Sequence, residues 1–159
     1  MTFDPTYALI LAATAADGLL AGASLDQSIK QLPARHRIGA IAFSAYSRAA
    51  DLGPGILWYA ILGISAAALT IGAAIAGLIA RVSATQTALL IIAASLAIFH
   101  SLATTQAAPI NFSQRRVAND EAALTRIFDR FARWQTVRVI LQPLTFAVMF
   151  WALVVHASA

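Results

Sequence analysis

Three ionisable side chains lie inside long apolar runs of this sequence, namely Asp17, His100 and Arg138. Charged groups are costly in hydrocarbon, so such residues are functional candidates wherever a chain crosses a membrane. The imidazole of His100 suits a general base, and equally a metal ligand, a haem ligand or a tether between helices. Asp17 suits a proton acceptor, a cation partner or a ligand anchor, and equally a hydrogen-bonded structural acid.

Arg138 has polar neighbours at a helical spacing. Gln142 follows it by four positions and so shares its face of a helix, and Asn111 ends another apolar run at a similar depth. Together they offer donors that could hold an oxyanion in a medium of low dielectric constant. The alternative is that Arg138 extends to lipid headgroups. Arg48 and Asp51 either join this cluster or pair with each other.

A metal site is not expected, and neither is a cofactor. The other histidines, His36 and His156, lie far from His100 in the sequence, and no two form an HxxxH or HxxE spacing. The chain has no cysteine, which removes thiolate ligands, disulfides and a cysteine nucleophile. No nucleophile elbow and no glycine-rich phosphate loop is present, so hydrolase and nucleotide-binding functions have no support.

The elements that must position these residues are four apolar runs. Of the 159 residues, 60% are apolar and only 11% are charged. Each run approaches or exceeds the roughly 20 residues that a helix needs to cross a bilayer. The sequence therefore predicts an all-α fold, a bundle of four transmembrane helices that forms one domain over residues 1–159. The predicted spans are residues 6–25, 56–80, 84–108 and 136–156.

Two connecting segments are predicted to be amphipathic helices. In loop one, residues 34–50 place apolar side chains at helical intervals. In loop three, Asp120 and Glu121 resemble a helix cap with an acidic first turn. An apolar stripe then follows, made of Leu124, Ile127, Phe128 and Phe131. This second helix is expected either to lie on the membrane surface or to cover the mouth of the bundle.

The basic residues predict the orientation. Ten of the eleven lie in or beside loops one and three, and Arg81 alone lies in loop two. The positive-inside rule makes loops one and three cytoplasmic and both termini extracytoplasmic, in what we expect to be a bacterial inner membrane. Asp4 and Asp17 make the first run a poor signal peptide, so it is expected to remain in the protein. No basic module with interleaved aromatic residues suggests nucleic acid as a partner.

The end of the third run and the start of the fourth resemble a known family. Pro109, Ile110 and Asn111 close the third run, and Arg133, Trp134 and Arg138 open the fourth after a polar helix. This arrangement is similar to that of the anthrone oxygenase-like family of small four-helix membrane proteins, most of which are catalogued only as a domain of unknown function. The resemblance covers nearly the whole chain by architecture, and its specific part is these few residues.

The resemblance implies oxygenation of an aromatic anthrone without metal or flavin, in which a base removes an acidic C–H proton and the carbanion reacts with dioxygen. His100, or alternatively Asp17, would be the base. The enolate oxygen would be stabilised by Arg138, Asn111 and Gln142, and Trp134 would contact the flat substrate.

Two other functions remain open at this point. One is a non-catalytic membrane subunit, or a small-molecule-binding protein, in a homo-oligomer or with a membrane-protein partner. In that case Trp134 would only anchor the bundle at the bilayer surface. The other is a transporter subunit, which the lack of an inverted repeat disfavours. An enzyme acting on a hydrophobic small molecule predicts a cavity reached by His100 and Arg138 together.

Overall fold

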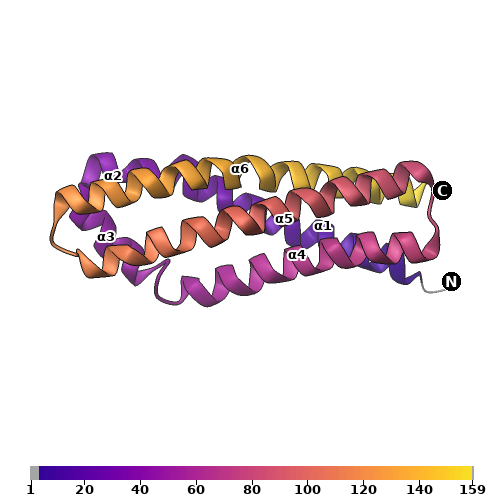
Figure 1. Cartoon of the computed structure of the whole chain (residues 1–159), viewed down its shortest axis with the longest axis horizontal. Coiled ribbons are helices and arrows are strands. Elements are labelled where there is room, and N and C mark those ends of the chain that lie inside the picture. The colour runs from indigo at the N-terminus through magenta and orange to yellow at the C-terminus, as the bar shows by residue number, and fades with distance from the viewer. Residues whose placement is uncertain (1–3, 159) are drawn as a thin grey trace.

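The computed structural model describes residues 4–158, and these residues form helices joined by short turns (Figure 1). The four long helices are α1 (Pro5–Asp26), α4 (Gly55–Ala80), α5 (Ala84–Ser113) and α6 (Glu121–Ala157). Shorter elements join them at one end of the molecule: the π-helical segment η1 (Gln27–Gln31), α2 (Leu32–Ile38), α3 (Ala40–Ala49) and the 3-10 segment η2 (Gln114–Arg116). The all-α fold predicted from the sequence is confirmed.

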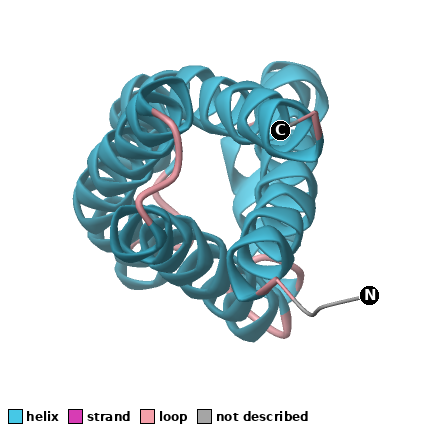
Figure 2. Cartoon of the chain, turned by 90° about the vertical axis from the view of Figure 1, so that its right-hand side faces the viewer, coloured by secondary structure: helices cyan, strands magenta, loops and turns pink. Residues whose placement is uncertain are grey.

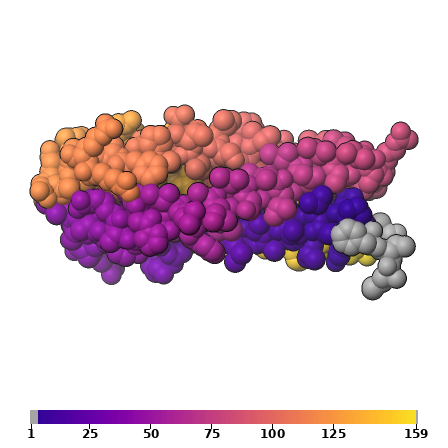
Figure 3. Space-filling model, turned by 90° about the horizontal axis from the view of Figure 1, so that it is seen from below, coloured from indigo at the N-terminus to yellow at the C-terminus, as the bar shows by residue number. Residues whose placement is uncertain are grey.

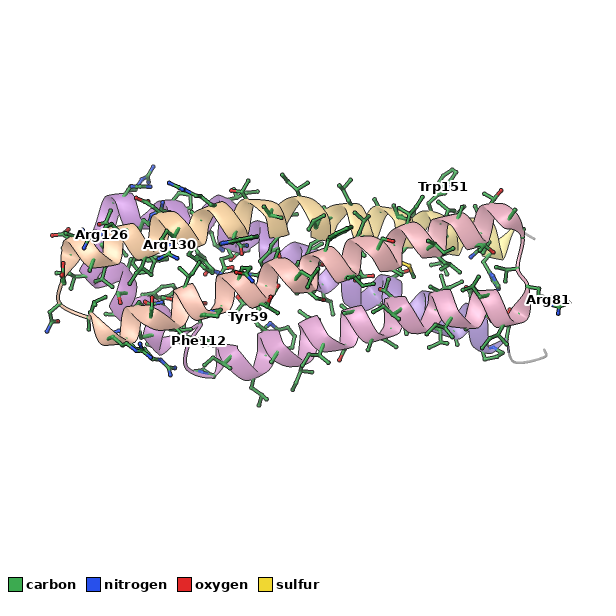
Figure 4. The ribbon with its side chains drawn as sticks, in the orientation of Figure 1. Tyr59, Arg81, Phe112, Arg126, Arg130 and Trp151 are labelled. Carbon is green, nitrogen blue, oxygen red and sulfur yellow. The ribbon has the colours of Figure 1, made fainter. Side chains whose placement is uncertain are left out.

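The four long helices form a closed ring when viewed along their axes (Figure 2). α1 packs against α4 and α6, and α5 packs against the same two helices. Both ends of the chain and the α4–α5 turn lie at one end of the bundle, while α2, α3 and the α5–α6 connection lie at the other (Figure 1). Arg81 marks the first end, and Arg126 and Arg130 mark the second, which we call the basic end (Figure 4).

Local signals explain where the helices begin and turn. The Asp4 carboxylate caps α1 by accepting hydrogen bonds from the backbone N–H groups of Thr6 at 2.8 Å and Tyr7 at 3.2 Å. α6 begins after Asp120, whose side chain accepts from the Ala123 N–H at 2.8 Å, so the cap predicted there is confirmed. The turn before α4 needs a glycine at position 53, because a Cβ there would lie 2.5 Å from a carbonyl oxygen.

The long helices have the dimensions and surface of membrane spans. All four are long and apolar enough to cross a bilayer. Large apolar side chains face outward along them, among them Ile64 at 71% exposure and Phe99 at 60%. Water would disfavour such a surface, whereas lipid accepts it. The chain is therefore an integral membrane protein.

α6 is much longer than the bilayer requires. Its 37 residues span about 55 Å, against about 30 Å of hydrocarbon. The amphipathic stretch predicted for loop three is not a separate helix, because α6 continues through it into the fourth span without a break. Leu124, Phe128 and Phe131 are buried there against Phe43 of α3 and Ala107 of α5. This stretch therefore extends the bundle at its basic end, and it does not lie apart from the bundle as a surface anchor.

The interior contains three apolar clusters along its length. The basic-end cluster is formed by Leu32, Ala40, Phe43, Ala107, Leu124, Phe128 and Phe131. The middle cluster is formed by Leu20, Leu62 and Ala66. The far cluster contains Ile10, Leu90 and Met149 among several fully buried alanines, whose small side chains let the helices approach closely. A cavity lies between the basic-end cluster and the middle one.

Candidate functional site

The cavity between these two clusters, which we call the interface cavity, has a volume of about 220 Å³. Phe131 of the basic-end cluster and Leu20 of the middle cluster both line it. Every long helix contributes to its wall, together with η1 and the turn before α4. Its polar lining includes His100, Asn111, Arg138, Asp51 and Tyr59. The cavity predicted for His100 and Arg138 together is therefore present.

His100 lies on α5 and is only 5% exposed. Its Nε2 atom is buried, and no residue in the described part of the chain offers it a hydrogen-bond partner. Thr104, one turn further along α5, donates its hydroxyl to the His100 backbone carbonyl at 3.0 Å and leaves the imidazole free. No side chain of the described residues holds either ring nitrogen, so one can carry the proton while the lone pair of the other is available to accept a proton from a ligand.

Arg138 reaches the cavity from α6 and is held from one side. Its Nη1 atom donates to the Gln135 side-chain oxygen at 2.7 Å. Its Nε atom is buried, and no described residue accepts a hydrogen bond from it. The ion pairs found within residues 4–158 do not include Arg138. Its positive charge thus has no ionic partner in the described chain.

Gln135 holds the Arg138 side chain in place and is itself hydrogen-bonded to the first helix and η1. Its side chain is buried, at 1% exposure, and its amide nitrogen donates to the Ser24 carbonyl at 3.3 Å and the Ser28 hydroxyl at 3.1 Å. Ser28 belongs to η1, and π-helical turns often occur beside functional sites. Gln135 therefore connects Arg138 to the first helix of the bundle.

Asn111 is oriented by a network at the basic end. Its side-chain oxygen accepts a hydrogen bond from Gln114 at 2.8 Å, which leaves its amide N–H₂ group as a donor beside the cavity. Gln114 is fully buried, accepts from Ser44 at 3.0 Å and donates to Ser47 at 3.4 Å. Ser47 in turn donates to Asp51 at 3.1 Å.

Asp51 provides the carboxylate at the rim of the cavity. Burial raises the pKa of Asp51 above its ordinary value, and the hydrogen bond from Ser47 partly opposes this rise. Asp51 does not pair with Arg48, whose Nε atom donates instead to the Ser44 carbonyl at 3.2 Å. Of the two alternatives for these residues, Asp51 joins the polar cluster and Arg48 does not line it.

The cavity opens sideways between α4 and α5. Ile56 and Phe112 line it and remain 37% and 41% exposed, and Ala60 between them is also exposed. Tyr59 and Phe112 lie on these two neighbouring helices in the half of the bundle nearer the basic end (Figure 4). Seen from below, a recess between α4 and α5 exposes part of α6 behind them (Figure 3). Trp58, 56% exposed in the first turn of α4, suits the lipid–water interface at this depth.

Three of the predicted site residues lie outside this cavity wall. Asp17 is buried at 1% exposure and accepts a hydrogen bond from Thr70 of α4 at 2.8 Å, as a structural acid would. Gln142 is buried one turn from Arg138, with its side-chain oxygen lacking a partner in the described chain, and does not line the cavity. Trp134 packs against the basic-end cluster.

Gln135 and Tyr59 contribute to the site without having been assigned a role in it from the sequence. The spacing of Gln135 and Arg138, three positions apart, was a usable signal because such residues share a helix face. Tyr59 resembled an ordinary interfacial aromatic, and nothing in its local sequence distinguishes it.

The arrangement joins a free imidazole, a braced guanidinium and an amide donor in a largely apolar space. Such a set can abstract a proton and stabilise the negative charge that results. Within residues 4–158, no three His, Cys, Asp or Glu side chains are grouped so as to hold a metal ion. Comparison of the chain with protein-family models, curated proteins and solved structures finds no match.

Proposed function

We propose that this chain is a membrane-embedded, cofactor-independent oxygenase-like enzyme that acts on a hydrophobic aromatic substrate of the anthrone type. The observation that carries the proposal is that His100 and Arg138, which lie on different helices and far apart in the sequence, line one cavity. The resemblance at Asn111, Trp134 and Arg138 supports the same chemistry.

In the proposed reaction, His100 removes a proton from the acidic CH₂ group of the substrate through a ring nitrogen of its imidazole. Arg138 and Asn111 stabilise the enolate oxygen that becomes negative. The carbanion adds dioxygen, and the hydroperoxide loses water to leave a carbonyl. One oxygen atom enters the product and the other leaves as water, so no external reductant is needed.

The lateral opening supports delivery of the substrate from lipid. An apolar molecule dissolved in the bilayer would meet Ile56, Ala60 and Phe112 at the surface of the bundle. The polar end of the substrate would then enter beside Asn111. We place the basic end in the cytoplasm of a bacterial inner-membrane protein, because ten of the eleven basic residues lie on that side.

The unpaired guanidinium of Arg138 also favours a second candidate, a non-catalytic small-molecule-binding protein. Such a protein would use the same cavity and the same Arg138 contact. Only His100 separates the two candidates, since a binder has no need of a free base.

Dioxygen uptake by the purified protein in lipid nanodiscs tests the proposal, with an anthrone as substrate. His100→Asn should lower turnover by about a hundredfold or more, because general bases contribute rate factors of this size. His36→Asn is the matched control, since His36 is exposed on α2 and lies outside the interface cavity. Uptake no faster than in empty nanodiscs, or full activity of His100→Asn, would refute the proposal.

A further inference from the structure

The guanidinium nitrogens of Arg138 that have no partner among the described side chains indicate what kind of ligand group would bind there. Nη1 is engaged with Gln135, whereas the described residues offer Nε no acceptor. No side-chain hydrogen bond in residues 4–158 involves Nη2 of Arg138. Nε and Nη2 form the edge of a guanidinium that matches the two oxygens of a carboxylate.

No carboxylate of the described chain occupies that edge. Asp26 pairs with Lys30, Asp129 with Arg35, and Asp4 with His156. Asp51 lines the same cavity but accepts a hydrogen bond from Ser47, and the ion pairs within residues 4–158 do not join it to Arg138. A guanidinium buried within a bundle of membrane helices is costly without a counter-ion.

The remaining walls of the cavity indicate the size and polarity of the rest of the ligand. Its other walls are largely apolar, from Leu20, Ile56, Ala60, Phe112 and Phe131. A volume of about 220 Å³ lies below the roughly 300–1,000 Å³ of pockets for drug-sized ligands, so a compact body fits best. Aromatic side chains from two helices, Phe112 of α5 and Phe131 of α6, favour a flat ring system.

We propose that the interface cavity binds a flat apolar acid from the bilayer, whose carboxylate is held by the Nε and Nη2 edge of Arg138. The inference deepens the proposed function, and rests on it for the cavity being the substrate site. The second N–H of Nη2 and the amide of Asn111 remain as donors for the enolate oxygen. Gln135 is the positioning residue, because its hydrogen bond to Nη1 restricts the orientation of the guanidinium and leaves Nε and Nη2 without an acceptor from the described side chains. Its own bonds to Ser24 and Ser28 keep that orientation before any ligand arrives.

The test compares a fluorescent anthracene carboxylate with its neutral carboxamide, which has nearly the same shape. Binding is measured in nanodiscs by fluorescence, with partition into protein-free nanodiscs subtracted. The wild-type protein should bind the carboxylate more than about tenfold more tightly than the amide, because a bidentate charged contact replaces a neutral one. Arg138→Gln should remove this preference, and Arg138→Lys should retain only part of it.

Arg130→Gln is the matched control, because Arg130 is an exposed arginine on the same helix, outside the cavity. Arg130→Gln should leave the preference for the carboxylate unchanged. If Arg130→Gln and Arg138→Gln lost this preference equally, general surface charge would explain it and the inference would be overturned. Equal affinities of the wild-type protein for acid and amide would also overturn it. If Arg138→Gln does not fold, Gln135→Ala gives a second test, since it should weaken the preference while the guanidinium remains.

The outcome is separable from that of the oxygenase assay, because binding needs no turnover. A carboxylate preference without dioxygen uptake would retain this inference and refute the proposed function. Dioxygen uptake with neutral anthrones, without a carboxylate preference, would support the proposed function and overturn this inference.

Discussion

Replacing Gln135 with leucine tests the brace behind the candidate site. Leucine keeps most of the side-chain volume but removes three hydrogen bonds. The bond from Arg138, at 2.7 Å, involves a charged group and contributes about 1.5–3 kcal/mol. The bonds to Ser24 at 3.3 Å and Ser28 at 3.1 Å are longer and neutral, and bonds of this kind between membrane helices contribute about 0.5 kcal/mol each.

The free energy of unfolding of Gln135→Leu should therefore fall by about 2.5–4 kcal/mol. Reversible unfolding in mixed detergent micelles, followed by helical circular dichroism, measures this difference. Thr136→Val is the control on the adjacent residue, because the Thr136 hydroxyl is exposed and bonds only to the Ala132 carbonyl of its own helix at 3.0 Å. A loss for Gln135→Leu no larger than that for Thr136→Val would show that the brace does not exist.

Other contacts give further predictions. Thr70→Val should destabilise the bundle by about 1–3 kcal/mol, since it leaves the buried carboxyl of Asp17 without its hydrogen bond, whereas Asp17→Asn should be tolerated; comparing the two in the same unfolding assay checks this. At the opposite end, the hydrogen bond from His156 lowers the pKa of Asp4 below 3.8, so this contact stabilises the fold above that pH and its contribution is lost as the pH falls through the lower folded-state value. Thermal unfolding across this range should show a loss of stability in the wild-type protein and none in Asp4→Asn. A variant that loses as much stability as the wild-type protein over the same pH range would contradict this prediction. Ala60→Trp should slow entry of the anthracene carboxylate by narrowing the mouth of the cavity, which stopped-flow fluorescence would detect; an unchanged association rate would mean that ligands enter elsewhere.

The long elements of this fold could be predicted from sequence because hydropathy alone specifies a membrane span. The relation of loop three to the fourth span could not. Leu124, Phe128 and Phe131 form an apolar stripe that suits a membrane surface as well as a protein interior. Only the presence of Phe43 and Ala107 beside that stripe decides that it packs within the bundle, and such contacts between distant segments leave no mark in the local sequence.

The candidate site, too, could be predicted from the sequence only in part. Asn111, His100 and Arg138 were each conspicuous as polar groups within or at the end of an apolar run, and the structure brings them to one cavity. Asp17 was equally conspicuous, but its depth in α1 places it beside Thr70 instead. Which polar residues share a cavity depends on the rotation of each helix about its axis, and side-chain packing between helices sets that rotation.

The most direct test of the proposed oxygenase activity is the fate of isotopically labelled dioxygen in the presence of an anthrone and the protein in nanodiscs. The proposed mechanism predicts one labelled oxygen in the product carbonyl and one in water, with formation of the labelled product lost in His100→Asn and Arg138→Gln and retained in His36→Asn. Product without label, or labelled product formed at the same rate in His100→Asn as in the wild-type protein, would contradict it.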